Sequence, residues 1–534
     1  MPKMKNTLLT FIALGSAVLS ASAQGLDSST ATAIKNHFSS VLEGKNEKYV
    51  SDIKIPYSDI ATYRSSVWDQ WKDANDGYSE IKLPTLPTRY DGQLRIPAVW
   101  EIPADLEPQA SLKYAWGRLG SSTDACPLII FLHGSGAKET EWELAKTLAP
   151  SFDSKPAIYF IPQFPNEELN GVNYRRWWQK GKQWVWEKII RQVNLRDEID
   201  INKVYFIGIS EGAYGSQRLG TYYADYLAGI APMAGGEPLN NAPCENLRHV
   251  AVHFRTGSND NGFYRSTLTQ ACGDSLDLLQ QQYPDGYVHD VKTVAGADHT
   301  LPKYGEAFPW LVQQTRTTNP KHINWEDYTM DGNWRKGFYN IEVTRRSFPI
   351  NCNRTYYQMD IDGNNINMQV RGLYYETTND YNNPYGDDLV LNFNRHYATA
   401  TSGEFKVYLN NDLVDLSKPV TLTVNGKKVF NGKLQPNLAD MVNSTALFYD
   451  KERVYPTHID VNLDNMTADG PTSGIDSLTA EDADENAPVE YYNLQGISLS
   501  AYMNEIARWS TIKDERGTSY PFARSVSLAV GINF

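Results

Sequence analysis

Cysteine is scarce in this chain, which has four in 534 residues: Cys126, Cys244, Cys272 and Cys352. Their spacing lacks the closely spaced pairs of a structural zinc site, so we expect no metal of that kind. Four cysteines allow more than one disulfide pairing, and the sequence does not choose between them. If a pair forms, we favour Cys244 with Cys272, because both fall in loop-like stretches of one predicted domain.

Long hydrophobic runs and basic blocks are also missing. The longest largely apolar run, residues 8–19, is well short of the roughly 20 residues that a membrane-spanning helix needs. Lysine and arginine total 50 against 63 aspartates and glutamates, a net charge of −13, and no basic block stands out. We therefore expect no membrane span and no nucleic-acid partner. With 41% hydrophobic residues, the chain can bury a core, which excludes a wholly disordered protein.

The N-terminus has the organisation of a secretory signal peptide. Two lysines precede the apolar run at 8–19, and small residues at 21–23 follow it. This pattern predicts that residues 1–23 are a signal peptide cleaved between Ala23 and Gln24, and that the mature protein is secreted or periplasmic. A buried N-terminal helix is the alternative interpretation.

Residues 110–316 alternate short apolar runs with longer amphipathic segments, and 534 residues suggest about three units. Such runs are typical of parallel strands that helices bury on both faces. Six runs carry the pattern: residues 127–132, 157–161, 203–207, 229–233, 249–254 and 288–294. We therefore predict an α/β domain over residues 24–316, with a doubly wound, mostly parallel sheet and an N-terminal extension.

The rhythm changes after residue 316. Residues 320–463 form many short segments of strand type with turn signals between them. The clearest signal is Asn425-Gly426 between two alternating segments, because both residues of a two-residue hairpin turn must accept a positive φ. We predict a smaller, antiparallel β-sandwich domain over residues 320–463.

The C-terminal part differs in composition. Residues 464–488 are acidic and poor in apolar side chains, which predicts a linker. Residues 489–534 form a tail of uncertain origin. Its start, residues 490–496, resembles short C-terminal extensions of secreted proteins, whereas residues 525–534 resemble the last strand of an outer-membrane β-barrel. A single strand cannot make a barrel, so our interpretation is a gene-fusion or assembly scar.

The first chemical motif is Gly208-Ile209-Ser210-Glu211-Gly212, which follows the apolar run at 203–207 and precedes a helical stretch. In a G-x-S-x-G turn between strand and helix, small flanking residues let the backbone fold tightly and lift the serine hydroxyl above the sheet. The spacing alone is weak evidence, and the strand–turn–helix context makes it strong. We predict Ser210 to be a nucleophile.

The second motif is the glycine-rich loop at residues 133–136, His-Gly-Ser-Gly, directly after the run at 127–132. Such a loop can turn the backbone N–H of Gly134 or Ser135 toward the nucleophile. With the N–H of Glu211 it would form a two-donor oxyanion hole. The alternative is a plain tight turn in which His133 only packs.

A base should lie in a loop beyond a later strand. His299 lies in a glycine-containing loop after residues 288–294. The other downstream histidines of the domain lie in or beside segments of strand type, which is typical of packing residues: His249, His253 and His289. His299 is therefore the predicted base.

The acid should lie between the nucleophile and the base in the chain, since the order Ser, acid, His is typical of this arrangement. Asp260 comes shortly after the run at 249–254 and is our choice for the residue that orients His299. Three other residues stay open as rivals: Asn259, Asp290 and Asp298.

On these residues, the segment 110–316 resembles an α/β-hydrolase-fold serine esterase of the dienelactone-hydrolase and prolyl-oligopeptidase-like branch. The resemblance covers less than half of the chain. It implies hydrolysis of carboxylic esters through an acyl-enzyme, with no metal or organic cofactor. A dienelactone hydrolase has a cysteine nucleophile, so Ser210 shifts the expectation to ordinary carboxylic esters.

Aromatic residues and arginines precede the nucleophile strand, and we predict that Arg176, Trp177 and Trp178 bind substrate. Aromatic faces can stack on sugar rings or phenolic acyl groups, and Arg175 or Arg176 could receive a carboxylate. The alternative is that the nearby Trp184 and Trp186 are core anchors of a helix. Secretion and the extra β domain favour acyl or phenolic esters of plant polysaccharides, as for acetyl xylan or feruloyl esterases.

Two other functions stay open. A prolyl-oligopeptidase-like peptidase would share the triad, but the several hundred residues of a propeller are missing before it. A glycan-binding protein on an inactive hydrolase scaffold would use residues 320–463 to hold glycan, which the intact serine, aspartate and histidine argue against. No sequence feature indicates an oligomeric state.

Overall fold

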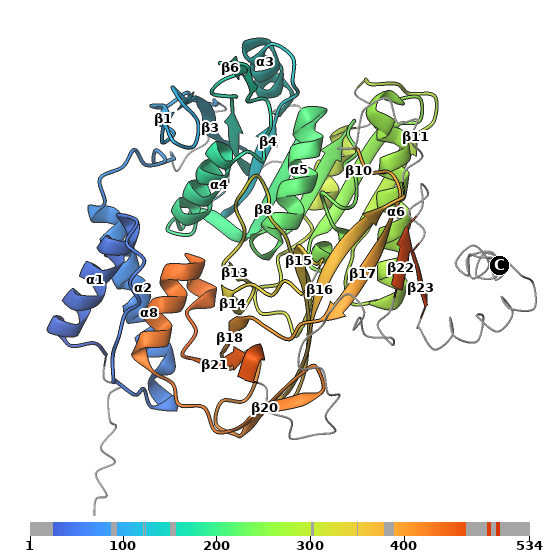
Figure 1. Cartoon of the computed structure of the whole chain (residues 1–534). Helices are drawn as coiled ribbons and strands as arrows, with labels where there is room; N and C mark the ends of the chain where they lie inside the picture. Colours follow the sequence, from blue (N-terminus) through green and yellow to red (C-terminus); the bar gives the residue numbers. More distant parts are fainter. Residues whose placement is uncertain are drawn as a thin grey trace, which may run out of the picture.

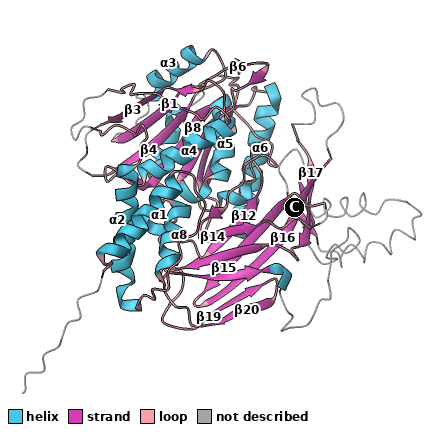
Figure 2. Cartoon of the chain, turned by 60° about the vertical axis from the view of Figure 1, so that its left-hand side comes forward, coloured by secondary structure: helices cyan, strands magenta, loops and turns pink. Residues whose placement is uncertain are grey.

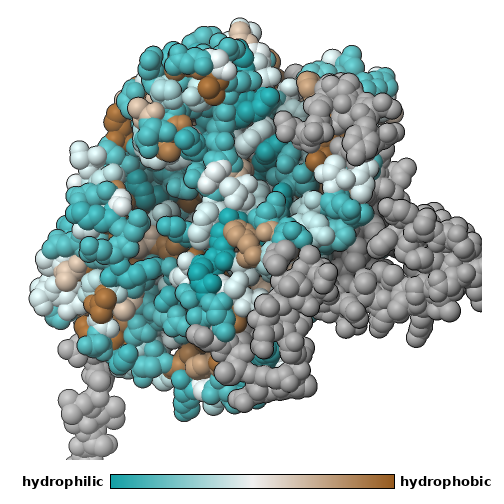
Figure 3. Space-filling model, viewed as in Figure 1, coloured by the Kyte–Doolittle hydropathy of each residue, from teal (hydrophilic) through white to brown (hydrophobic). Residues whose placement is uncertain are grey.

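The computed structural model describes residues 25–86, 93–120, 122, 124–149, 156–300, 304–349, 351–378, 389–465, 489–492 and 498–501. The predicted signal peptide, the linker beyond residue 465 and the strand-like end at 525–534 lie outside these residues. Within them, no helix is long and apolar enough to cross a membrane. The face seen in Figure 3 is mostly hydrophilic, with apolar residues scattered over it.

A seven-stranded sheet forms the upper half of the molecule in Figure 1. Its strand order is β11 (His289–Val294), β10 (Ala251–Gly257), β9 (Gly229–Met233), β8 (Ile199–Ile209), β4 (Cys126–Leu132), β5 (Ala157–Pro162) and β3 (Tyr114–Leu119). Neighbouring strands are parallel except β3, which is antiparallel to β5. The prediction of a mostly parallel α/β sheet is confirmed, and all six predicted runs contribute strands.

Both faces of this sheet are covered by helices. Along β4, Leu128 and Ile130 join one core cluster and Ile129 and Phe131 the other, because successive side chains of a strand point to opposite faces. The first cluster also receives apolar residues from α4 (Lys180–Val193), α5 (Glu211–Tyr222) and α6 (Arg265–Gln282). The second receives them from α3 (Lys138–Leu148) and α7 (Ala307–Leu311).

The β-rich region after residue 320 contains two further sheets. The larger has the order β12 (His322–Asp327), β15 (Arg354–Asp362), β16 (Asn365–Thr377), β17 (Phe393–Thr399), β22 (Val489–Tyr492) and β23 (Ser498–Ala501), and β19 (Val420–Val424) joins β16 to β20 (Lys427–Gly432). The smaller has the order β13 (Gly337–Phe338), β14 (Ile341–Arg345), β18 (Glu404–Leu409) and β21 (Thr457–Asn462). Short hairpins elsewhere pair β1 (Trp100–Glu101) with β2 (Ser111–Leu112) and β6 (Glu168–Leu169) with β7 (Val172–Asn173).

The predicted hairpin turn is confirmed, since Asn425 and Gly426 have φ values of 48° and 75° between antiparallel β19 and β20. The expectation of purely antiparallel pairing is wrong at one place, because β16 and β19 run parallel. The start of the predicted tail also takes part, as β22 pairs with β17 and β23 with β22. A β-sandwich arrangement of the two sheets stays a prediction.

The N-terminal helices pack against a helix from the predicted β region. Helices α1 (Ser28–Leu42) and α2 (Ile60–Gly77) contact each other and α8 (Leu438–Phe448), a helix of the β region (Figure 2). Backbone hydrogen bonds fix the segment between α1 and α2 to the start of α8: Ile55 N–H donates to Pro436 O at 2.8 Å, and Leu438 N–H donates to Ile53 O at 3.1 Å. The segment that we predicted as an extension of the α/β domain is therefore also part of the layer around α8.

A buried ionic network joins the two regions. Asp225 of the α/β region accepts hydrogen bonds from Arg335 at 3.0 Å and from Arg453 at 2.6 Å. Asp450 accepts from Arg453 at 3.0 Å and from Arg316 at 2.7 Å. Burial raises the pKa of Asp225, but the two arginines more than offset this and hold it below its usual range.

The four cysteines are all buried and free. The pair that we favoured lies together, with the Cys244 and Cys272 sulfurs 3.8 Å apart and unbonded.

Candidate active site

The turn between β8 and α5 holds Ser210 in a strained conformation, with φ 55° and ψ −112°. A left-handed conformation of this kind costs a non-glycine residue about 1–3 kcal/mol. The flanking glycines make the turn possible. A Cβ on Gly208 would lie 1.9 Å from Gly212 O, and one on Gly212 would lie 2.0 Å from Leu132 O. The serine is therefore presented by a turn that tolerates no side chain at either flank.

The three predicted catalytic side chains meet. Ser210 Oγ lies 3.1 Å from His299 Nε2, and His299 Nδ1 lies 2.7 Å from Asp260 Oδ2. The tautomer that satisfies both contacts has Nδ1–H donating to the carboxylate, which leaves Nε2 free to accept the serine proton. They meet because β8, β10 and β11 are parallel, so the residues after each strand lie at the same edge of the sheet.

Asp260 is held from its other side. It is buried, and its Oδ1 accepts a hydrogen bond at 2.9 Å from Arg265, which also donates to the Tyr214 hydroxyl at 2.7 Å.

Of the residues that rivalled Asp260 as the predicted acid, Asp290 binds Arg255 at 2.6 Å and the Asn259 amide donates to Gly296 O at 3.3 Å.

The other histidines of the domain lie elsewhere. His249 contacts His322 O at 2.6 Å, and His289 contacts Tyr287 O at 2.7 Å. His253 is buried, 3.8 Å from Asp290. Among the described histidines, His299 alone contacts Ser210.

The glycine-rich loop is supported by packing. His133 is buried, its Nδ1 donates to Gly134 O at 2.7 Å, and its Nε2 accepts from Phe164 N–H at 3.3 Å. Burial lowers the pKa of His133 to about 4, so the ring is neutral. The Gly136 N–H donates to Glu141 at 3.2 Å. Ser135 reaches the cavity beside Ser210, whereas Gly134 is not part of its lining.

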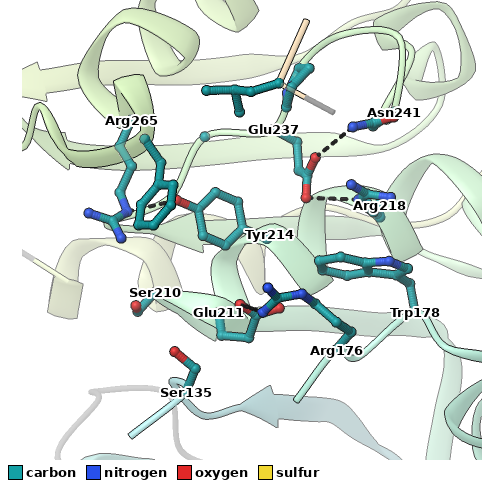
Figure 4. Close-up of a pocket in the computed structure, with 14 residues that line it drawn as sticks. Ser135, Arg176, Trp178, Ser210, Glu211, Tyr214, Arg218, Glu237, Asn241 and Arg265 are labelled. Atoms are coloured by element: carbon teal, nitrogen blue, oxygen red, sulfur yellow. Dashed lines mark hydrogen bonds and ion pairs between the residues drawn. The ribbon is translucent and has the colours of Figure 1, made fainter. Parts of the chain in front are cut away.

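A cavity of about 590 Å³ opens at Ser210. Figure 4 shows Ser135 and Ser210 at one end and Trp178 and Arg218 at the other. Its further lining residues are Arg176, Glu211, Tyr214, Gly236, Glu237, Pro238, Asn241, Phe263, Arg265 and Leu389. Three arginines therefore face the cavity of a chain whose net charge is −13.

The predicted substrate-binding residues divide. Arg176 and Trp178 line the cavity. Trp177 does not: it is 0% exposed, stacks on Phe164 with ring centroids 4.1 Å apart, and donates from its indole N–H to His133 O at 3.0 Å. That prediction is corrected, because the side chain supports the 133–136 loop from within the core.

The carboxylates of the cavity are paired with its arginines. Glu211 Oε2 accepts from Arg176 at 2.6 Å, and Glu237 Oε1 accepts from Arg218 at 2.8 Å. Burial raises the pKa of Glu211 to about 7, and the nearby charge of Glu237 adds to this while Arg176 opposes it. Glu211 Oε1 has no hydrogen-bonding partner among the described residues.

Several lining residues were not predicted. Arg265, Tyr214 and Arg218 lie within helices and carry no motif, so the sequence offers no signal for them. Leu389 lies beyond the predicted domain altogether. The sequence likewise suggests no role for the Glu237 carboxylate. No group of three or more histidine, cysteine or carboxylate side chains in the described ranges could hold a metal ion.

No family model and no curated protein matches this chain. Several solved structures are similar to part of it. A thermostable esterase shares 19% identity over 41% of this chain, with a TM-score of 0.32, and less than two thirds of that esterase, 63%, is covered. A CE1 ferulic acid esterase from Anaeromyces mucronatus, solved with ferulic acid, shares 16% identity over 44% of this chain and 98% of its own, with a TM-score of 0.29. Est1E from Butyrivibrio proteoclasticus shares 11% identity over 41% and 97%, with a TM-score of 0.27.

Proposed function

We propose that the chain is a serine carboxylesterase and that its α/β region is an α/β-hydrolase domain. The observation that carries this proposal is the unbroken relay from Ser210 Oγ through His299 to the buried Asp260. This arrangement makes a hydroxyl nucleophilic, because the imidazole can take its proton while the carboxylate stabilises the imidazolium that results.

The reaction has two halves. Ser210 Oγ attacks the ester carbonyl as its proton passes to His299 Nε2, and the tetrahedral intermediate collapses when His299 returns that proton to the leaving alcohol. Water then attacks the acyl-enzyme, again losing its proton to His299, and the acid is released with Ser210 regenerated. Arg265 acts as a positioning residue by holding Asp260.

Backbone N–H groups would stabilise the oxyanion. The N–H of Glu211 belongs to the first turn of α5, where no preceding helical carbonyl is available to accept it. The loop at Ser135 faces the same end of the cavity and supplies the second donor. Each such donor is worth about 3–4 kcal/mol in the transition state.

The substrates we propose are acyl or phenolic esters of plant polysaccharides, hydrolysed outside the cytoplasm after removal of residues 1–23. Support comes from the size of the cavity, its aromatic residues Trp178, Tyr214 and Phe263, and the polar side chains among its lining residues. The predicted secretion signal agrees with a polymeric substrate outside the cell.

Replacement of Ser210 by alanine tests the proposal. We expect hydrolysis of 4-nitrophenyl acetate and methyl ferulate to fall by a factor of about 10³ or more. The exposed Ser417→Ala variant, in a distant loop, is the control and should retain parental activity. Parental ester turnover by Ser210→Ala would exclude this serine, and preferential cleavage of matched peptide substrates would favour a peptidase instead.

A further inference from the structure

A second cavity adjoins the first on the side away from Ser210. It has a volume of about 260 Å³ and shares Trp178, Arg218 and Asn241 with the larger cavity. In Figure 4, Trp178 and Arg218 lie at the end of the larger cavity that is remote from Ser210. A substrate that occupies the larger cavity can therefore continue past these residues into the smaller one.

The smaller cavity is built by both regions of the chain. Its remaining wall includes Tyr328 and Asp331, from the segment after β12 of the β region. That segment is fixed to the start of α4, because Lys180 N–H donates to Asp331 Oδ2 at 2.6 Å and Gln183 Nε2 donates to Met330 O at 2.8 Å. The β region thus contributes a held wall to the cavity.

The polar groups that line the smaller cavity include hydrogen-bond donors and acceptors without a partner among the described residues. Arg218 uses Nε for Glu237, and its terminal N–H groups have no acceptor in the described part of the chain. The amide oxygen of Asn240, another lining residue, has no partner there either. Asp331 Oδ1 is likewise unpaired among the described residues, since only Oδ2 accepts the Lys180 N–H.

This chemistry fits a hydroxyl-rich ligand. A hydroxyl group both donates and accepts, so it can use the guanidinium N–H groups and the amide and carboxylate oxygens at once. The charges of Arg218 and Arg354 are balanced by Glu237 and Glu326, which disfavours recognition of a strongly charged group.

We propose that the second cavity is a subsite for a neutral sugar residue next to the scissile ester, so that the β region selects the substrate directly. This inference rests on the proposed esterase function. It assigns to the β region a wall of the substrate site, where the sequence suggested a separate accessory domain.

Two removals test the subsite: Asn240→Ala and Asp331→Ala, combined in one variant. Kinetics compare 4-nitrophenyl acetate, which needs only the larger cavity, with acetylated xylotriose, which should reach both. Because two hydrogen bonds of about 1 kcal/mol each are lost, we expect kcat/KM for acetylated xylotriose to fall about 30-fold relative to that for 4-nitrophenyl acetate. The exposed Asn367→Ala variant on β16 is the matched control and should keep the parental ratio.

Binding separates this inference from the esterase proposal. Calorimetry measures xylotriose binding without any turnover. It uses the Ser210→Ala variant, with and without the Asn240→Ala and Asp331→Ala substitutions. Binding that weakens about 30-fold in the combined variant supports the subsite. The subsite is overturned if the combined variant keeps both the parental ratio of kcat/KM values and the parental affinity for xylotriose. It is also overturned if the parental protein hydrolyses 4-nitrophenyl acetate but neither binds xylotriose nor hydrolyses acetylated xylotriose. Failure of 4-nitrophenyl acetate hydrolysis alone, with xylotriose binding that depends on Asn240 and Asp331, would reject the esterase and keep the sugar site.

Discussion

The two sheet regions bury their strands differently. In β4 of the α/β region, Leu128 to Leu132 are all buried, because helices cover both faces. In β16 of the β region, Ile366, Met368 and Val370 are buried while the residues between them are exposed. A sheet covered on both faces can present chemistry only at its edges and ends, whereas a sheet with one open face can offer walls to its neighbours. The Ser210–His299–Asp260 contacts lie at the carboxyl ends of the strands of the α/β sheet, and the β region contributes a wall of the smaller cavity.

The largest expected effect tests whether the relay belongs entirely to the α/β region. Asp260→Asn removes the carboxylate that orients and stabilises His299, and we expect kcat for 4-nitrophenyl acetate to fall about 10³–10⁴-fold. Asp290→Asn, which removes a carboxylate of the edge strand β11 that binds Arg255 of β10, is the control. A loss of less than tenfold for Asp260→Asn, or a comparable loss for Asp290→Asn, would contradict the assignment.

The next effect tests how independent the regions are. Arg453→Met leaves the buried Asp225 and Asp450 with fewer partners, which should cost about 3–5 kcal/mol of unfolding free energy. The half-exposed Arg345→Met is the control, since surface pairs contribute about 0–1 kcal/mol. Urea unfolding followed by tryptophan fluorescence measures both. If the α/β region and the β region unfold in two transitions, and the urea midpoint of one of them is unchanged in Arg453→Met, the ionic network does not couple the regions.

The difference between the regions also explains what the sequence could predict. The strands of the α/β sheet and the turn at Ser210 depend on local patterns. These are apolar runs and glycines at positions where a larger residue would clash, together with the order of the segments in the chain. His299 and Asp260 followed from their places in loops after later strands and from the chain order Ser, acid, His. The wall at Asp331, the Arg265 support of Asp260 and the packing of α1 on α8 depend on contacts between distant segments, which no local pattern encodes. Trp177 and Trp178 are adjacent in sequence, and only packing decides which is buried.

A smaller effect concerns pH and the first region alone. The Glu211 carboxyl has its pKa raised by burial from 4.5 to about 7, so between these values the folded protein binds more protons than the unfolded chain. Stability should therefore fall as the pH rises from 4.5 to 7, by roughly 3 kcal/mol at most from this group. We expect Glu211→Gln to flatten that part of the stability profile in thermal melts. An unchanged slope would mean that the carboxyl is already ionised at the lower pH.

The smallest effect concerns the β region alone. Gly426 has φ 75° in the hairpin between β19 and β20, so Gly426→Ala should cost about 1 kcal/mol. Gly77→Ala at the end of α2, where φ is not left-handed and a Cβ meets no atom within 4 Å, is the control and should be neutral or stabilising. Equal melting temperatures of the two variants would contradict the turn geometry.

The packing of α1 and α2 against α8 has a consequence for how the chain is made. These two helices are synthesised before the α/β sheet, but α8, which packs against both of them, is synthesised after it. Until then the side of these helices that contacts α8 is uncovered, so this layer can close only after the chain has been made through residue 448. A fragment that stops at residue 316 would lack α8, so the surface of these helices that contacts it would be exposed, and the fragment should require chaperones or removal of these two helices to stay monomeric.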